Sequence, residues 1–127
     1  MITQALIIGQ SFWEMVRLNN ILVPRNASAC LILTENKKLL LQLRDDREDI
    51  FFPGRWGLFG GAIEEGETPL KAIKREILEE ISVDFNSDRF FGCGEITLEN
   101  LKYQITRYFF TLSISQTELQ SIVVTEG

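Results

Sequence analysis

The sequence contains no histidine. This absence excludes a Ser-His-Asp or Cys-His catalytic relay and any histidine-ligated zinc, so proton transfer would have to use carboxylates, lysine, tyrosine or water. Cysteine occurs only at Cys30 and Cys93, each inside an apolar run and without CxxC spacing. A disulfide framework or a metal-thiolate site is therefore not indicated, and we expect both thiols to be buried and reduced.

An excess of positive charge is also lacking, because 13 basic residues stand against 18 acidic ones and the net charge is −5. This balance argues against binding to nucleic acid through phosphate contacts, so no stable nucleic-acid partner is expected. A small anionic substrate stays compatible, since a bound metal ion reverses the local charge of a carboxylate pocket. The N-terminal segment has no basic n-region and no long apolar core, which predicts no membrane association and a cytoplasmic location.

The chain has 127 residues, 45% of them hydrophobic, which is the size and composition of one globular domain. Residues 1–26 are predicted to form an N-terminal extension, and residues 27–127 the domain proper. The apolar residues of the extension favour packing on the core or on a second subunit over a role in substrate binding.

Short apolar runs predict strands separated by turns, and one segment between them has a helical pattern. Thr68 followed by Pro69 is a hydroxyl N-cap with proline at the first helical position, so a helix is expected from there to about Ile81. Its buried stripe would be Leu70, Ile73, Ile77 and Ile81. The predicted strands are Ala29–Leu33, Leu39–Arg44, Phe90–Ile96, Tyr103–Leu112 and Ile122–Val124.

These elements indicate an α+β or mixed α/β domain. The first two strands are expected to form a hairpin. Tyr103–Leu112 is apolar on both faces, which predicts a central strand of a sheet that is covered on both sides. Trp56 is expected in the core.

The predicted helix carries Glu76, Glu79 and Glu80 within an arc of roughly 100°, beside its apolar stripe. Three carboxylates that converge in this way suit a hard divalent cation such as Mg²⁺. Taken alone, the pattern favours a solvated acidic face that Arg75 and the neighbouring lysines partly neutralise.

Residues 61–83 read GAIEEGETPLKAIKREILEEISV. This segment resembles the Nudix box, the signature of the Nudix hydrolase family, written G-x5-E-x7-R-E-U-x-E-E-x-G-U with U aliphatic. Every defined position matches except the last glycine, where Ser82 stands. Serine in the left-handed conformation that suits this glycine would cost about 1 kcal/mol without touching a carboxylate.

The resemblance implies a Nudix-like α/β/α sandwich with a mixed β-sheet. Members of that family generally continue with a further helix where this sequence reaches Gly127. Two alternatives stay open here, a naturally short chain and a truncated one, and either predicts that the C-terminal helix is missing. Phe59 stands where many members carry a proline before the glycine pair, which would alter the rigidity of that loop.

In function, the resemblance implies a pyrophosphohydrolase that uses Mg²⁺ or Mn²⁺ and hydrolyses a nucleoside diphosphate linked to another moiety, with water attacking phosphorus. The metal ligands of the family map onto Glu79 and Glu80, with the Gly60 carbonyl beside them. Glu76 would be a further ligand or the base that orients water.

The resemblance also implies that Arg75 and Glu67 form an ion pair holding the helix against the preceding loop. In many members a later loop adds one more glutamate to the metal site; Glu126 is the candidate here, with Glu99 second.

Outside the box, Arg44 and Arg47 are candidates for contacts with substrate phosphates, and Phe52 for stacking on a base. Solvated arginines and a packed aromatic ring would account for the same residues. A non-catalytic Nudix-type module that senses a nucleotide is the alternative function. Such modules typically lose glutamates of the box, and their retention here favours the enzyme. A nucleotide-derived substrate is the expected partner, and a homodimer is compatible because family members often pair.

Overall fold

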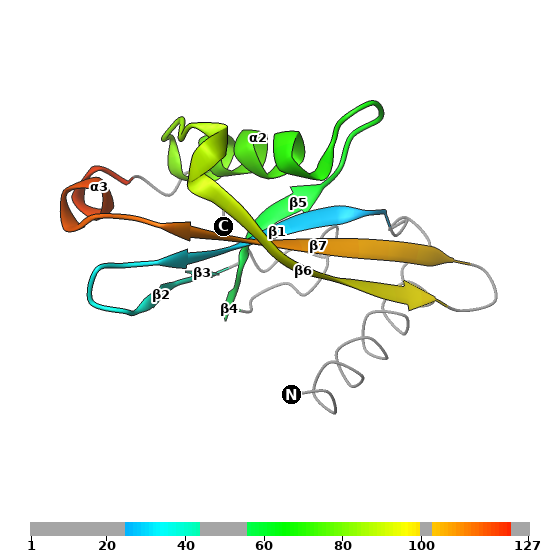
Figure 1. Cartoon of the computed structure of the whole chain (residues 1–127), viewed down its shortest axis with the longest axis horizontal. Coiled ribbons are helices and arrows are strands. Elements are labelled where there is room, and N and C mark those ends of the chain that lie inside the picture. The colour runs from blue at the N-terminus through cyan, green and yellow to red at the C-terminus, as the bar shows by residue number, and fades with distance from the viewer. Residues whose placement is uncertain (1–24, 44–55, 100–102, 123–127) are drawn as a thin grey trace.

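The computed structural model describes residues 25–43, 56–99 and 103–122. Within these residues a five-stranded sheet carries one long helix on one face (Figure 1). Two further short strands, β3 (Gln42–Leu43) and β4 (Trp56–Gly57), pair with each other. The strands of the main sheet are β1 (Ala27–Leu33), β2 (Leu39–Leu40), β5 (Phe59–Ala62), β6 (Phe90–Glu99) and β7 (Gln104–Ser113).

The main sheet is mixed, in the order β2-β1-β7-β6, and β5 pairs with β1 beside β2. β1 and β7 run parallel over the whole length of β1, from Ala27 opposite Arg107 to Leu33 opposite Ser113. The other pairs are antiparallel. The predicted central position of the 103–112 strand is thus confirmed, because β7 lies between β1 and β6. The predicted hairpin of the first two strands is confirmed by the β1–β2 pair.

Helix α2 (Pro69–Ile81) begins and ends as the sequence predicts. The Thr68 hydroxyl accepts a hydrogen bond from the Lys71 N–H, and Pro69 occupies a position where no backbone donor is required. At the other end Ser82 adopts a left-handed conformation, φ 61° and ψ 30°, and its N–H donates to the Leu78 carbonyl. This is the conformation for which the Nudix pattern specifies glycine.

The core lies between α2 and the sheet. Ile73, Ile77 and Ile81 are fully buried, and Leu70 packs against them from the first turn. Phe59 of β5 is also fully buried in this cluster, which accounts for an aromatic residue at this position. A buried phenylalanine of this kind stabilises a fold by about 3–5 kcal/mol relative to alanine.

A second, shorter helix follows β7. α3 (Gln116–Ser121) starts in a capping box, in which the Ser115 hydroxyl accepts from the Glu118 N–H and the Glu118 carboxylate accepts from the Ser115 N–H. Arg89, at the end of the 3₁₀ turn η1 (Ser87–Arg89), donates to both oxygens of Glu118 at 2.9 and 3.0 Å. This bidentate pair connects α3 to the segment that leads into β6.

Several sequence predictions are wrong in detail. Cys93 is exposed, like all residues of the strand β6 from Phe91 to Thr97, whereas Cys30 is buried. Trp56 is 68% exposed; its partner in the β3–β4 pair, Leu43, is exposed as well. Ile122 follows α3 outside any strand, and Val123–Val124 lie outside the described residues. The 39–44 strand is interrupted at Leu41 and divides into β2 and β3.

The expected fold class is confirmed, since a mixed sheet is combined with helices. In the described ranges the long helix α2 covers one face of the sheet only. These ranges therefore do not include the second helical layer of the predicted α/β/α sandwich. Within those ranges no helix has the length and apolar character to cross a membrane.

We expect Ser82→Gly to raise the free energy of unfolding by about 0.5–1 kcal/mol, because glycine removes the steric cost of the left-handed conformation. Thermal unfolding should show a rise of a few degrees in Tm. Ser113→Gly, at the end of β7 where no such strain exists, serves as the control and should lower Tm. A Ser82→Gly protein that is less stable than the wild type would contradict the strain.

Candidate functional site

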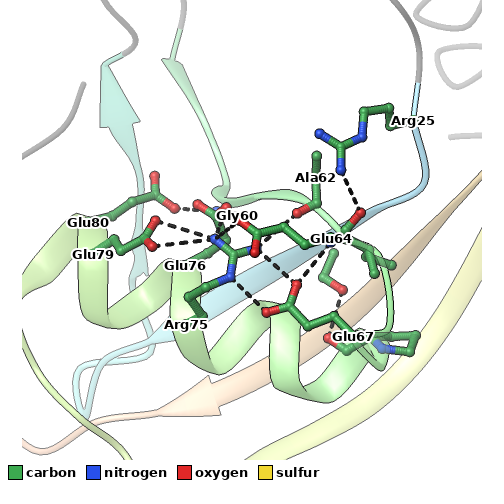
Figure 2. Close-up of polar contacts among 12 residues, drawn as sticks. Arg25, Gly60, Ala62, Glu64, Glu67, Arg75, Glu76, Glu79 and Glu80 are labelled. Atoms are coloured by element: carbon green, nitrogen blue, oxygen red, sulfur yellow. Dashed lines mark hydrogen bonds and ion pairs between the residues drawn. The ribbon is translucent and has the colours of Figure 1, made fainter.

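Arg75 stands at the centre of the candidate site, on the face of α2 that borders β5 (Figure 2). Its guanidinium contacts carboxylates at several sequence positions and also donates to the Ala62 carbonyl at 3.0 Å. Only 23% of the side chain is exposed. The contacting carboxylates are Glu64 (3.7 Å), Glu67 (2.7 Å), Glu76 (2.8 Å) and Glu79 (3.4 Å).

The contact with Glu67 is the most complete of these. Arg75 donates from Nε at 2.7 Å and from Nη2 at 3.1 Å, so the two planar groups meet in the fork geometry that makes such pairs strong. Glu67 also accepts from the Glu64 N–H. The hydrogen bond from Arg75 is the largest influence that lowers the pKa of Glu67, to about 2. Glu67 therefore holds the turn before α2 as a charged partner of the helix.

Glu76 lies directly against the glycine pair. A Cβ added to Gly61 would come within 2.5 Å of the Glu76 Oε1 atom, so a side chain there would displace this carboxylate from its present place. The side chain is 14% exposed. The group that lies against the Gly61 backbone is thus a carboxylate of the chain itself.

Glu80 is the buried carboxylate of the site, with 4% of its surface exposed. Its Oε1 accepts the Gly60 N–H at 2.8 Å, and its Oε2 accepts Nε2 of Gln42 at 2.7 Å. Gly60 has a φ of +141°, and a Cβ there would meet the Ser28 carbonyl oxygen at 2.1 Å. A side chain at this position is therefore excluded by the backbone of β1, as well as by its conformation.

The donors of this site match the chemistry of a hard divalent cation, because Glu76, Glu79 and Glu80 offer carboxylate oxygens from one helix and Gly60 adds a carbonyl. The close fit of the Glu76 carboxylate against Gly61 supports this assignment, since it brings charge to the β5 backbone. Glu79, with 47% of its side chain exposed, is the member nearest to solvent. In the described residues no three acidic side chains lie close enough to enclose a metal ion, so binding requires movement of side chains that now contact Arg75.

The structure thus brings together Gly60, Glu67, Arg75, Glu76, Glu79 and Glu80, all of which the sequence singles out. Arg44, Arg47, Phe52 and Glu126 lie outside the described residues, and their assignments stay predictions. Glu99, the second candidate for the additional ligand, lies at the end of β6, where it accepts a hydrogen bond from Gln104.

Gln42 is the residue of this site that sequence reasoning missed. It is a polar residue in the run LLLQL, and 2% of it is exposed. The only signal in the sequence is this interruption of an otherwise apolar segment, which fits an outward-facing residue of a strand equally well.

Comparison with known proteins gives the family. A model of the NUDIX domain matches residues 23–121, and the chain belongs to the Nudix family. Two curated relatives are a U8 snoRNA-decapping enzyme of Homalodisca vitripennis and the nucleoside triphosphatase NudI of Escherichia coli. The first is 28% identical over 101 residues, 76% of this chain and 54% of the relative. NudI is 45% identical over 51 residues, 40% of this chain and 35% of the relative. The chain thus spans about half or less of the length of these relatives.

Solved structures show the same fold. A MutT/nudix family protein of Enterococcus faecalis aligns with a TM-score of 0.65 and 18% identity, over 81% of this chain and 40% of that one. The dihydroneopterin triphosphate pyrophosphohydrolase of E. coli aligns with a TM-score of 0.58 and 24% identity, over 79% of this chain and 73% of that one. At these identities the likeness concerns the fold.

We expect Glu67→Gln to lose a pH-dependent part of the stability. The pKa of Glu67 falls from 4.5 to about 2 on folding, so its contribution is fully present above about pH 4.5 and is lost as the pH falls towards 2. The wild type should therefore have the higher Tm at pH 7, and the difference from Glu67→Gln should shrink through this window. A difference that stays constant between pH 7 and pH 2.5 would contradict the ion pair.

Proposed function

We propose that this protein hydrolyses a nucleoside diphosphate linked to another moiety, in a reaction that depends on Mg²⁺ or Mn²⁺. Membership of the Nudix family supports this, as do relatives named as a nucleoside triphosphatase and a decapping enzyme. The observation that carries the proposal is the gathering of the box side chains around Arg75 and Gly60, with the Glu80 carboxylate buried beside them.

Each residue of the site has a proposed part. Glu79 and Glu80, with the Gly60 carbonyl, would hold the divalent cation, which when bound lowers the pKa of water and neutralises charge on phosphate oxygens. Glu76 would be a further ligand, or would accept a proton from the attacking water at a carboxylate oxygen. Its place against Gly61 limits where that oxygen can lie, which favours a fixed position for the water.

Arg75 and Glu67 would act by position. Their ion pair, together with the Arg75 bond to the Ala62 carbonyl, fixes α2 relative to the end of β5. The helix that carries the glutamates and the backbone of Gly60 and Gly61 therefore keep one relative geometry. A displacement of about 1 Å at such a site can reduce a rate by about 100-fold.

We expect the purified protein to release phosphate or a nucleoside monophosphate from members of a nucleotide panel when Mg²⁺ or Mn²⁺ is present. The panel would hold nucleoside triphosphates, nucleotide sugars, ADP-ribose, dinucleoside polyphosphates and capped oligonucleotides. Glu79→Gln should lower kcat by about 100-fold or more, since it removes a charged ligand of the cation. Product release is followed by chromatography.

Glu95→Gln, on the edge strand β6, is the matched control and should retain wild-type turnover. Equal turnover by the wild type and Glu79→Gln would overturn the catalytic assignment of the box. No turnover of any panel member by the wild type would favour the nucleotide-sensing alternative.

Mg²⁺ alone should raise Tm. A cation that binds only the folded state, where it neutralises the repulsion between the carboxylates, adds RT ln(1 + [Mg²⁺]/Kd) to the free energy of unfolding. The rise should be smaller in Glu80→Gln. Thermal unfolding with and without Mg²⁺, at constant ionic strength, measures both. A Tm that does not respond to Mg²⁺ in the wild type would count against a cation site on α2.

A further inference from the structure

We propose that Gln42 is a positioning residue, which holds the Glu80 carboxylate in place for the divalent cation. The inference rests on the metal-dependent function proposed above and adds a residue that lies outside the Nudix box. Its basis is one buried hydrogen bond, from Gln42 Nε2 to Glu80 Oε2 at 2.7 Å.

The carboxamide of Gln42 connects separate parts of the fold. Its Nε2 donates to Glu80 on α2 and also to the Leu58 carbonyl, at 3.2 Å, in the link between β4 and β5. The register partner of Gln42 in the β3–β4 pair is Gly57, which has no side chain to compete for this space. The second oxygen of Glu80 is held by the Gly60 N–H, so donors from two directions fix the plane of the carboxylate.

The two groups that donate to Glu80, the Gln42 amide and the Gly60 N–H, are both neutral. A lysine or arginine at position 42 would also satisfy Glu80, but it would cancel the charge that a cation needs. A carboxamide orients the carboxylate and leaves its negative charge in place. The burial of Glu80 makes that charge more effective toward a cation, because nearby water is largely excluded.

The carboxamide oxygen of Gln42 favours a role in the site over a role in packing alone. Gln42 Oε1 is buried and has no hydrogen-bond partner within the described part of the chain. The orientation of the amide is fixed, since both neighbours of Nε2 are acceptors. An unpaired buried oxygen destabilises the fold, and this cost stands beside the two acceptors that Nε2 satisfies, the Glu80 carboxylate and the Leu58 carbonyl. Oε1 shares a carbon atom with Nε2, which donates to Glu80, so a water held near that carboxylate would provide the missing donor.

The test uses Mn²⁺ alone as the probe. Electron paramagnetic resonance measures the concentration of free Mn²⁺ in solutions of the purified full chain, which gives the affinity. Gln42→Met keeps the length of the side chain and removes its hydrogen bonds. We expect Mn²⁺ to bind about 10–100-fold more weakly to this variant, the usual effect of losing a partner of a metal ligand. Gln120→Met is the matched control, because Gln120 is an exposed glutamine of α3, and its Mn²⁺ affinity should equal that of the wild type.

A double-mutant cycle separates positioning from folding. In a Glu80→Gln background, Gln42→Met should cause no further loss of Mn²⁺ affinity, since the carboxylate that it positions is gone. Should Gln42→Met not fold, Gln42→Asn takes its place, because its carboxamide is one methylene too short to reach Glu80, and the same loss is expected.

An unchanged Mn²⁺ affinity in the Gln42 variant, with or without a lower Tm, would overturn the inference and leave the proposed function standing. A wild-type protein that binds no Mn²⁺ would also overturn it. If the wild type binds Mn²⁺ and the Gln42 variant binds it more weakly, but no nucleotide is hydrolysed, the positioning role stands and the proposed function fails.

Discussion

The structure depends on one ion pair, between Arg75 in the middle of α2 and Glu67 just before the helix. The fork contact at 2.7 and 3.1 Å fixes the turn that joins β5 to α2, and the bond to the Ala62 carbonyl fixes the end of β5 itself. The backbone of Gly60 and Gly61 is thereby fixed relative to the helix that carries the glutamates, and these parts form one rigid frame. The pKa of Arg75 is raised, chiefly by its hydrogen bond with Glu67, so this frame keeps its positive centre at any physiological pH.

The glutamates of α2 differ stepwise in how far their side chains are exposed to solvent. Glu79 has about half of its side chain exposed, at 47%, Glu76 lies against Gly61, and Glu80 is buried with both oxygens hydrogen-bonded. Arg75 contacts the first two and holds their charges close together without a metal ion. The frame can therefore keep like charges near one another at a tolerable cost, and a divalent cation would compete with the guanidinium for them.

The sequence predicts much of this arrangement, because helix signals and box residues act locally. Thr68, Pro69 and the isoleucine stripe determine α2 within one stretch of chain, and the Nudix spacing places Glu67 against Arg75. Features that depend on tertiary contacts were missed or wrong. Trp56 is exposed in the short β3–β4 pair, and Cys93 is exposed in a strand that is open over most of its length. Gln42 reaches Glu80 across 38 positions, which no local pattern encodes.

The bulge in β6 has a consequence for solubility. β6 is ten residues long and, within the described residues, pairs only with β7, so the backbone groups of its other edge have no strand partner there. Phe91 and Ile96 are exposed on the faces of this strand. A strand edge of this length is a template for the addition of strands from other molecules. The register shift between Gly92 and Gly94 divides that template near its start, since a straight incoming strand can match only one side of the bulge at a time.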